Sequence, residues 1–241
     1  MHPPSQQGRA VFVPQIPRSK SYQFQPKVST VAILGCCRQE NGTKPEFGLA
    51  PQGFEQARAA GELLQKELEE MGVPVDSVKI RYSPFSRTTE TARVVAGVLG
   101  IPFEGPSCAV SLGYPAVMGL RERYFGPSYE LHSHDKYAEV WAVDEAHPHM
   151  APEGGESVAD VANRLSAVLS STETDFHSSE ILIVSHGDPL QIFQAVLSGA
   201  KENTSFLDGV RDMKMKGTAV ASVLSQHRKF ALHTGEVRRV V

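Results

Sequence analysis

Residues 181–190 read Ile-Leu-Ile-Val-Ser-His-Gly-Asp-Pro-Leu, and they indicate the architecture of the whole chain. The opening run of four apolar residues fits a strand buried on both faces, as in a parallel sheet. Pro189 fits the first turn of a following helix, where its missing N–H costs nothing. His186 is therefore expected at the carboxyl end of a strand and beside a helix N-terminus, where α/β sheets bind anions. The alternative is a histidine that only packs at a strand end and makes one local hydrogen bond.

The composition is that of an ordinary globular protein. The chain has 241 residues, of which 41% are hydrophobic and 21% charged, and this length fits one large α/β domain or two small ones. A net charge of −3 and a single Trp give no electrostatic or stacking signature for nucleic acid. No apolar run is long enough to span a bilayer, so we expect neither nucleic acid nor membrane as a partner.

The cysteines and the N-terminal composition bear on the compartment. Cys36, Cys37 and Cys108 form no disulfide framework, which indicates a reducing, cytoplasmic environment. Residues 1–28 are rich in Pro, Gln, Ser and basic residues and contain no Asp or Glu. We interpret them as a flexible or divergent tail; a transit peptide for an organelle is the alternative.

Strands and helices are predicted to alternate along most of the chain. Strands are expected at residues 28–34, 78–82, 181–184, 219–225 and 230–232, with a short extended segment at 101–102. Helices are expected at residues 51–71, 87–99, 158–169 and 189–197. In the first helix the core positions are Phe54, Ala57, Ala60, Leu64 and Leu68. This order predicts a three-layer α/β/α sandwich with a mostly parallel central sheet, in a single domain that spans residues 29–241.

Residues 104–156 form a long, weakly periodic region with many Gly, Pro and His residues. Inside a compact domain such a region is typically functional, so we predict a lid over a pocket. The pairs His132/His134 and His147/His149 suggest an alternative, because side chains two apart on an extended chain share a face that suits zinc. No Cys or carboxylate spacing completes such a site, and we predict no metal and no other cofactor.

Three further groups are candidates to converge on His186. Arg87 follows the second strand within Ser-Pro-Phe-Ser-Arg-Thr-Thr-Glu-Thr-Ala, residues 83–92, and a guanidinium at a helix N-terminus matches a phosphate. Glu122 lies within Leu-Arg-Glu-Arg-Tyr-Phe-Gly, residues 120–126, and is a candidate proton donor. An exposed arginine and a surface ion pair are the respective alternatives. The turn at residues 153–157, Glu-Gly-Gly-Glu-Ser, lines the pocket or caps the next helix.

These motifs, together with Leu-Ala-Pro-Gln-Gly-Phe-Glu-Gln-Ala at residues 49–57, resemble the histidine phosphatase superfamily in their order. The resemblance runs from about Leu49 to the C-terminus and is closest to the phosphoglycerate mutase-like branch, particularly its plant members. It implies a phosphoglycerate mutase-like fold and a phosphate pocket of two histidines and two arginines. On that map Arg87 clamps the phosphate, Glu122 donates a proton and His186 is the second histidine.

The resemblance also implies a reaction. A neutral imidazole attacks phosphorus, cationic side chains stabilise the phosphoryl oxygens, and the phosphoryl group passes to water or to a second hydroxyl without a metal. The expected partner is a small phosphorylated metabolite or a phosphoprotein.

The chain departs from the family at the nucleophile. The family's nucleophilic histidine lies in an Arg-His-Gly sequence after the first strand, whereas residues 35–38 here are Gly-Cys-Cys-Arg, and no histidine occurs between His2 and His132. The loop up to Leu49 is also shorter than the family loop. We interpret this difference as a replaced or skipped segment, as in a splice or gene-model variant. It predicts impaired phosphoryl transfer or, alternatively, a catalytically dead pseudoenzyme that binds a phosphate ligand.

A cysteine is an alternative nucleophile. A thiolate of Cys36 or Cys37 near a cationic pocket is a good nucleophile. The cysteine phosphatase signature requires an arginine six residues later, and Gly42 and Thr43 occupy those positions. Arg38 is the candidate to replace the missing arginine as a second phosphate ligand.

Overall fold

A single four-stranded sheet forms the centre of the protein. The computed structural model describes residues 27–33, 42–103, 117–129, 137–176, 179–202 and 218–240. Within these residues the strands are β1 (Lys27–Ile33), β2 (Val78–Tyr82), β3 (Glu180–His186) and β4 (Val237–Arg239), in the order β2-β3-β1-β4. β3 pairs in parallel with β2 and β1, and β4 pairs antiparallel with β1. The prediction of a mostly parallel sheet is confirmed.

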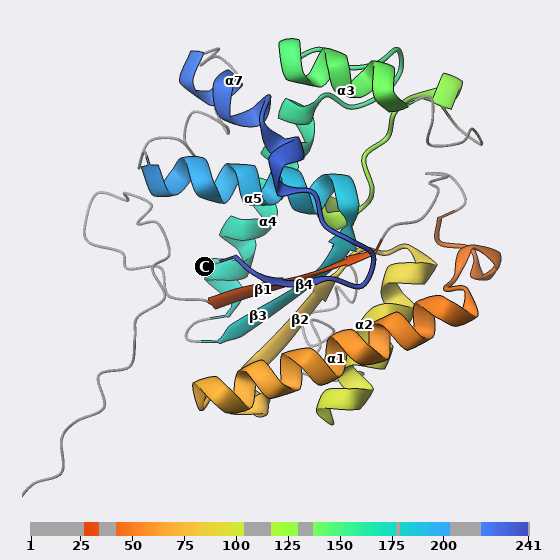
Figure 1. The fold of residues 1–241 in the computed structure, drawn as a ribbon, viewed down its shortest axis with the longest axis vertical. Helices are drawn as coiled ribbons and strands as arrows, with labels where there is room; N and C mark the ends of the chain where they lie inside the picture. The colour runs from red at the N-terminus through yellow and green to blue at the C-terminus, as the bar shows by residue number, and fades with distance from the viewer. Residues whose placement is uncertain are drawn as a thin grey trace, which may run out of the picture.

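Helices cover both faces of the sheet (Figure 1). α1 (Pro51–Met71) and α2 (Ser86–Leu99) lie on one face, and α4 (Val158–Asp175) and α5 (Gly187–Glu202) lie on the other. α3 (Tyr137–Ala146) and α7 (Thr218–Leu224) lie further out on the side of α4 and α5. Short 3-10 turns are η1 (Pro45–Phe47), η2 (Val75–Ser77), η4 (Met118–Leu120), η5 (Pro127–Tyr129) and η7 (His227–Phe230). The three-layer α/β/α sandwich is confirmed.

β3 is buried on both faces, as its continuous apolar run predicts. Ile181 and Ile183 belong to the core beneath α4 and α5, whereas Leu182 and Val184 belong to the core beneath α1 and α2. Burying an aliphatic side chain of this size contributes about 1.5–3 kcal/mol of hydrophobic free energy. β3 therefore joins the two cores and positions the residue at its carboxyl end.

α1 has the predicted bounds. It begins at Pro51 and ends at Gly72, which adopts a left-handed conformation with φ of 65° and donates its N–H to carbonyls of the last turn. Four of the predicted core residues are buried: Ala57, Ala60, Leu64 and Leu68. The prediction for Phe54 is wrong, because its side chain is 38% exposed. Phe54 lies in the first turn of α1, and the buried stripe begins one turn later.

α4 begins as predicted and extends further. Ser157 Oγ accepts the N–H of Asp160 at 3.1 Å, and the carboxylate of Asp160 accepts the N–H of Ser157 at 2.9 Å, which completes a capping box. The helix continues beyond Leu169 to Asp175. Thr172 is buried there and its hydroxyl donates to the carbonyl of Val168 at 2.7 Å, so tertiary packing extends a sequence of low helix propensity.

Three predicted extended segments are wrong. Residues 219–225 fall on the helix α7, where Val220 and Leu224, four residues apart, are buried against the core of α4 and α5. In the predicted strand 230–232, Phe230 is the last residue of the turn η7 and residues 231–232 follow it without regular structure; the last strand is instead the short edge strand β4. The segment at 101–102 does not join the sheet, because the N–H of Ile101 donates to the carbonyl of Ala96 at the end of α2.

Two predicted regions lie partly outside the described residues: residues 1–26 of the tail, and residues 104–116 and 130–136 of the lid. The described part of the lid region contains η4, η5 and α3, and its role as a lid stays a prediction. No helix among the described residues is long and apolar enough to cross a membrane.

Two neighbouring leucines of α1 test how this helix packs. Leu64 is 2% exposed and Leu63 is 46% exposed. We expect Leu64→Ala to lower the free energy of unfolding by about 2–5 kcal/mol, and Leu63→Ala to change it by less than about 0.5 kcal/mol. Urea denaturation measures both values; equal effects would contradict the packing described.

Candidate active site

His186, Arg87 and Glu122 lie together at the carboxyl ends of β2 and β3. His186 is the last residue of β3, Arg87 lies in the first turn of α2, and Glu122 follows η4; none is more than 5% exposed. Nη2 of Arg87 lies 2.9 Å from Nδ1 of His186, and Oε2 of Glu122 lies 3.7 Å from the same nitrogen. Nη2 of Arg87 and Oε2 of Glu122 are 4.0 Å apart. The structure thus brings together three of the residues predicted from separate motifs.

The hydrogen bonds of His186 indicate where its proton lies. A guanidinium only donates, so Nδ1 must accept from Arg87 and carries no hydrogen. Nε2 lies 2.7 Å from Oγ of Ser83 and therefore carries the hydrogen of the neutral ring. Burial, and then the positive charges of Arg87 and Arg164, lower the pKa of His186 well below its ordinary value. The imidazole is therefore neutral at physiological pH.

The described residues on either side of the cysteine segment lie beside this site. Ile33, the last residue of β1, pairs with His186 in the parallel register. The carbonyl of Gly42 accepts the N–H of Ser86, next to Arg87, at 2.8 Å. Residues 34–41 connect these two points. Cys36, Cys37 and Arg38 lie outside the described residues, so their proposed roles stay predictions.

A buried ion network holds the residue after Glu122. The N–H of Arg123 donates to Oε1 of Glu122 at 3.0 Å. The Arg123 guanidinium is fully buried and donates to both carboxylate oxygens of Asp144 in α3, at 2.6 and 2.8 Å, and to Asp188 at the start of α5, at 3.3 Å. Burial lowers the pKa of Arg123, but Asp144 and Asp188 outweigh that effect and raise it. Glu122 is therefore anchored to two helices.

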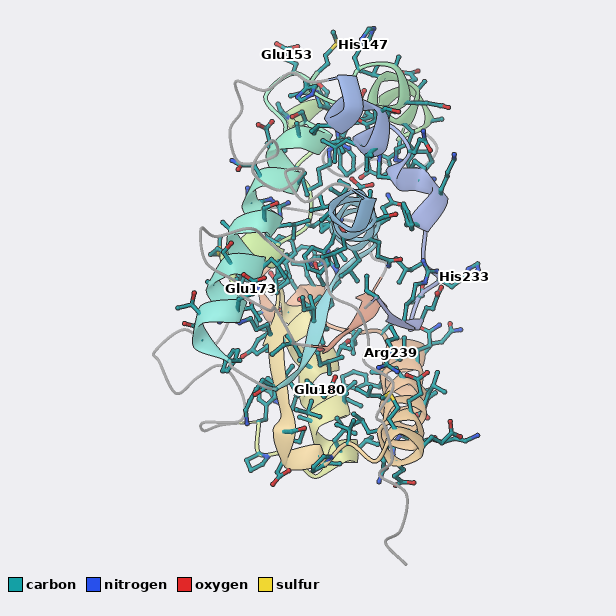
Figure 2. All side chains as sticks on the ribbon, turned by 90° about the vertical axis from the view of Figure 1, so that its left-hand side faces the viewer. His147, Glu153, Glu173, Glu180, His233 and Arg239 are labelled. Atoms are coloured by element: carbon teal, nitrogen blue, oxygen red, sulfur yellow. The ribbon has the colours of Figure 1, made fainter. Side chains whose placement is uncertain are left out.

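The turn at residues 153–157 supports the segment that contains Glu122. The carboxylate of Glu156 accepts hydrogen bonds from Arg121 at 2.5 Å, from Arg164 at 3.0 Å and from the N–H of Tyr124 at 3.0 Å. Glu153 is exposed and lies at the same end of the molecule as His147 (Figure 2). Of the two alternatives for this turn, the observed contacts are those of a helix cap and a support.

Backbone contacts leave no room for side chains between this turn and the Glu122 segment. A Cβ atom on Gly155 would lie 2.8 Å from the carbonyl oxygen of Tyr124. Gly126 has a φ of 96°, and a Cβ atom there would lie 2.2 Å from the carbonyl oxygen of Glu153. Glycine is required at both positions because backbone cannot move aside as a flexible side chain can.

The histidine pairs do not form a metal site in the part of the chain that the structure describes. His147 and His149 are both exposed, and no group of three His, Cys, Asp or Glu residues able to hold a metal occurs among the described residues. His132 and His134 lie outside them.

Sequence reasoning misses Ser83 and Asp144. Ser83 directly follows the last residue of β2, and a polar residue at the carboxyl end of a buried parallel strand is a recognisable signal. Asp144 gives no comparable signal, because it lies in α3, a helix with weak periodicity within the region predicted as a lid.

The fold and these contacts together define an α/β/α protein in which Arg87, Glu122 and His186 meet at the carboxyl edge of a mostly parallel sheet. The model of the histidine phosphatase superfamily (branch 1) matches residues 38–236, and the chain belongs to that family. The match begins at Arg38, directly after the two adjacent cysteines Cys36 and Cys37.

Solved structures have the same fold. The Mycobacterium tuberculosis protein of open reading frame Rv3214 is 22% identical with a TM-score of 0.56, over 88% of this chain and 89% of that one. A mycobacterial glucosyl-3-phosphoglycerate phosphatase is 20% identical with a TM-score of 0.51, over 70% and 78% of the two chains. A protein described as mycobacterial hydrolase 1 is 18% identical with a TM-score of 0.52, over 76% and 82%. No curated protein matches the chain.

The glycine contacts lead to a stability prediction. Gly155→Ala should lower the free energy of unfolding by about 1–3 kcal/mol, because the new methyl group meets backbone. Gly97→Ala in α2 is the matched control: an added Cβ atom meets nothing within 4 Å, and alanine should stabilise the helix by about 0.5–1 kcal/mol. Thermal or urea denaturation of both variants measures the difference, and a harmless Gly155→Ala would contradict the close contact.

The lowered pKa of His186 predicts how stability depends on pH. Above about pH 6.5 the ring is neutral in both the folded and unfolded states and costs nothing. Below that value His186 takes up a proton in the unfolded chain, whereas its buried ring stays neutral in the folded protein. The free energy of unfolding should therefore fall by up to about 1.4 kcal/mol per pH unit until the folded-state pKa is reached.

Urea denaturation between about pH 5 and 7 tests this dependence. His186→Gln should weaken the pH dependence, whereas His149→Gln, which removes an exposed imidazole, serves as the control. An identical slope in wild type and His186→Gln would show that the ring does not contribute.

Proposed function

We propose that the site formed by Arg87, Glu122 and His186 binds the phosphate group of a phosphomonoester, and that the protein is a phosphoglycerate mutase-like member of its family. The observation that carries this proposal is the convergence of the three side chains within 4.0 Å at the carboxyl ends of two parallel strands. Two helices begin at that edge, and helix N-termini favour anions.

The chemistry of each side chain suits phosphoryl transfer. The Arg87 guanidinium can form charge-assisted hydrogen bonds with two phosphate oxygens. His186 can donate a further hydrogen bond from Nδ1 once that nitrogen carries a proton. Glu122, whose Oε2 lies 3.7 Å from Nδ1, is the proposed proton donor to the leaving oxygen. Arg38 is the proposed second arginine of the pocket.

We further propose that phosphoryl transfer is impaired, because the sequence lacks the Arg-His-Gly nucleophile after β1. A catalytically dead protein that binds a phosphorylated metabolite or phosphoprotein is the second candidate, favoured by the same substitution. Cys36 and Cys37 are alternative nucleophiles at that point of the chain. The three cysteines favour a cytoplasmic location.

Binding of inorganic phosphate to the full chain tests the proposed pocket. Isothermal titration calorimetry should detect binding, and Arg87→Ala should weaken it by about 10–100-fold through the loss of charge-assisted hydrogen bonds. Arg93→Ala removes an exposed positive charge from the same helix and should change the affinity little. Absence of binding by the wild-type chain would refute the pocket.

Turnover of p-nitrophenyl phosphate separates the two functions. Slow hydrolysis that His186→Ala abolishes supports an impaired enzyme, whereas phosphate binding without hydrolysis supports the binding protein. Rapid turnover by the wild-type chain would contradict the proposed impairment. Prior alkylation with iodoacetamide should leave hydrolysis unchanged unless Cys36 or Cys37 acts as the nucleophile.

A further inference from the structure

We infer that Ser83 is a positioning residue: its hydroxyl can pair with Nε2 of His186 in either tautomer, and this lets Nδ1 gain the hydrogen that a bound phosphate oxygen requires. The inference deepens the proposed phosphate pocket and rests on it for the role of the ligand. Ser83 acts through the imidazole, because its hydroxyl lies against Nε2, on the side of the ring opposite to Arg87.

The Ser83 hydroxyl is itself held in position. Ser83 is fully buried, and its N–H donates to the carbonyl of Val184 at 2.9 Å, which ties it to β3 two residues before His186. Its Oγ also accepts the N–H of Phe85 at 3.4 Å, and the Phe85 ring packs edge-on to the imidazole with centroids 5.0 Å apart. The ring of His186 is thus confined between Ser83, Phe85 and Arg87.

A serine hydroxyl is the group that can serve Nε2 in both protonation states. In the ligand-free site Nδ1 accepts from Arg87, and Nε2–H donates to the serine oxygen. A phosphate oxygen at Nδ1 requires an N–H at that nitrogen. If the ring moves its proton to Nδ1, Nε2 becomes an acceptor and the Ser83 O–H can donate to it; if the ring takes up a second proton, Nε2–H still donates.

The charges around the ring favour the first of these responses. Arg87 from α2 and Arg164 from α4 oppose a second proton on His186, while Glu122 lies 3.7 Å from Nδ1 and favours a hydrogen there. A bound phosphate dianion would add further attraction for a hydrogen on Nδ1. Ser83 allows this exchange without leaving a buried nitrogen unpaired, which would otherwise oppose phosphate binding.

Nitrogen-15 NMR of the histidine rings in the full chain tests this inference. The wild-type His186 ring, assigned by its absence in His186→Gln, should show one tautomer with hydrogen on Nε2. In Ser83→Ala the buried Nε2–H loses its acceptor, so the ring signals of His186 should shift, and the affinity for inorganic phosphate should fall by roughly tenfold because Nε2 has no donor once the hydrogen moves to Nδ1. Ser83→Cys keeps the side chain near its original size with a weaker donor and acceptor, and should give an intermediate result.

Ser166→Ala is the matched control, because it removes another fully buried serine hydroxyl, one that donates to a carbonyl within α4. It should alter neither the ring signals nor phosphate binding. Ring signals in Ser83→Ala and Ser83→Cys identical to those of the wild type would overturn the inference. If the wild-type chain binds no phosphate, the proposed pocket fails, and the ring signals still decide the role of Ser83.

Discussion

β3 is buried on both faces and paired on both edges, and the geometry of the site depends on this constraint. A shift of its register by one residue would exchange Ile181 and Ile183 with Leu182 and Val184 between the two cores, so the register is strongly fixed. Its last residue, His186, therefore has a defined position relative to the ends of β1 and β2. α5 begins at the next residue, which brings a helix N-terminus to the same point.

The other side chains reach His186 by different structural means. Arg87 lies in the first turn of α2, shortly after β2, so local chain geometry is sufficient to place its side chain beside the end of β3. Glu122 lies in an irregular segment; it accepts the N–H of Arg123, and the Arg123 side chain is bound by Asp144 of α3 and Asp188 of α5. Buried ion pairs of this kind contribute little net stability because desolvation offsets the attraction. Their contribution here is to fix the position of Glu122 and to connect it to α3.

The accuracy of the sequence predictions follows the depth of burial. β3 and the helices α1, α2 and α4 were recognisable because each buries a regular set of apolar residues, and glycines such as Gly72 and Gly100 mark where α1 and α2 end. At the periphery the same reasoning fails. Val220 and Leu224 read as part of a strand in isolation but lie one helical turn apart on α7, and β4 is too short and polar to be identified.

The sequence by itself determined the alternation of strands and helices, the position of His186 at a strand end, and the motifs around Arg87 and Glu122, since these depend on local patterns of residue type. Only the tertiary structure decided that the side chains of Arg87, Glu122 and His186 meet. It also decided that Ser83 hydrogen-bonds to Nε2 of His186 and that Asp144 and Asp188 bind Arg123. These contacts join residues far apart in the chain, and their geometry arises from how the layers pack against the sheet.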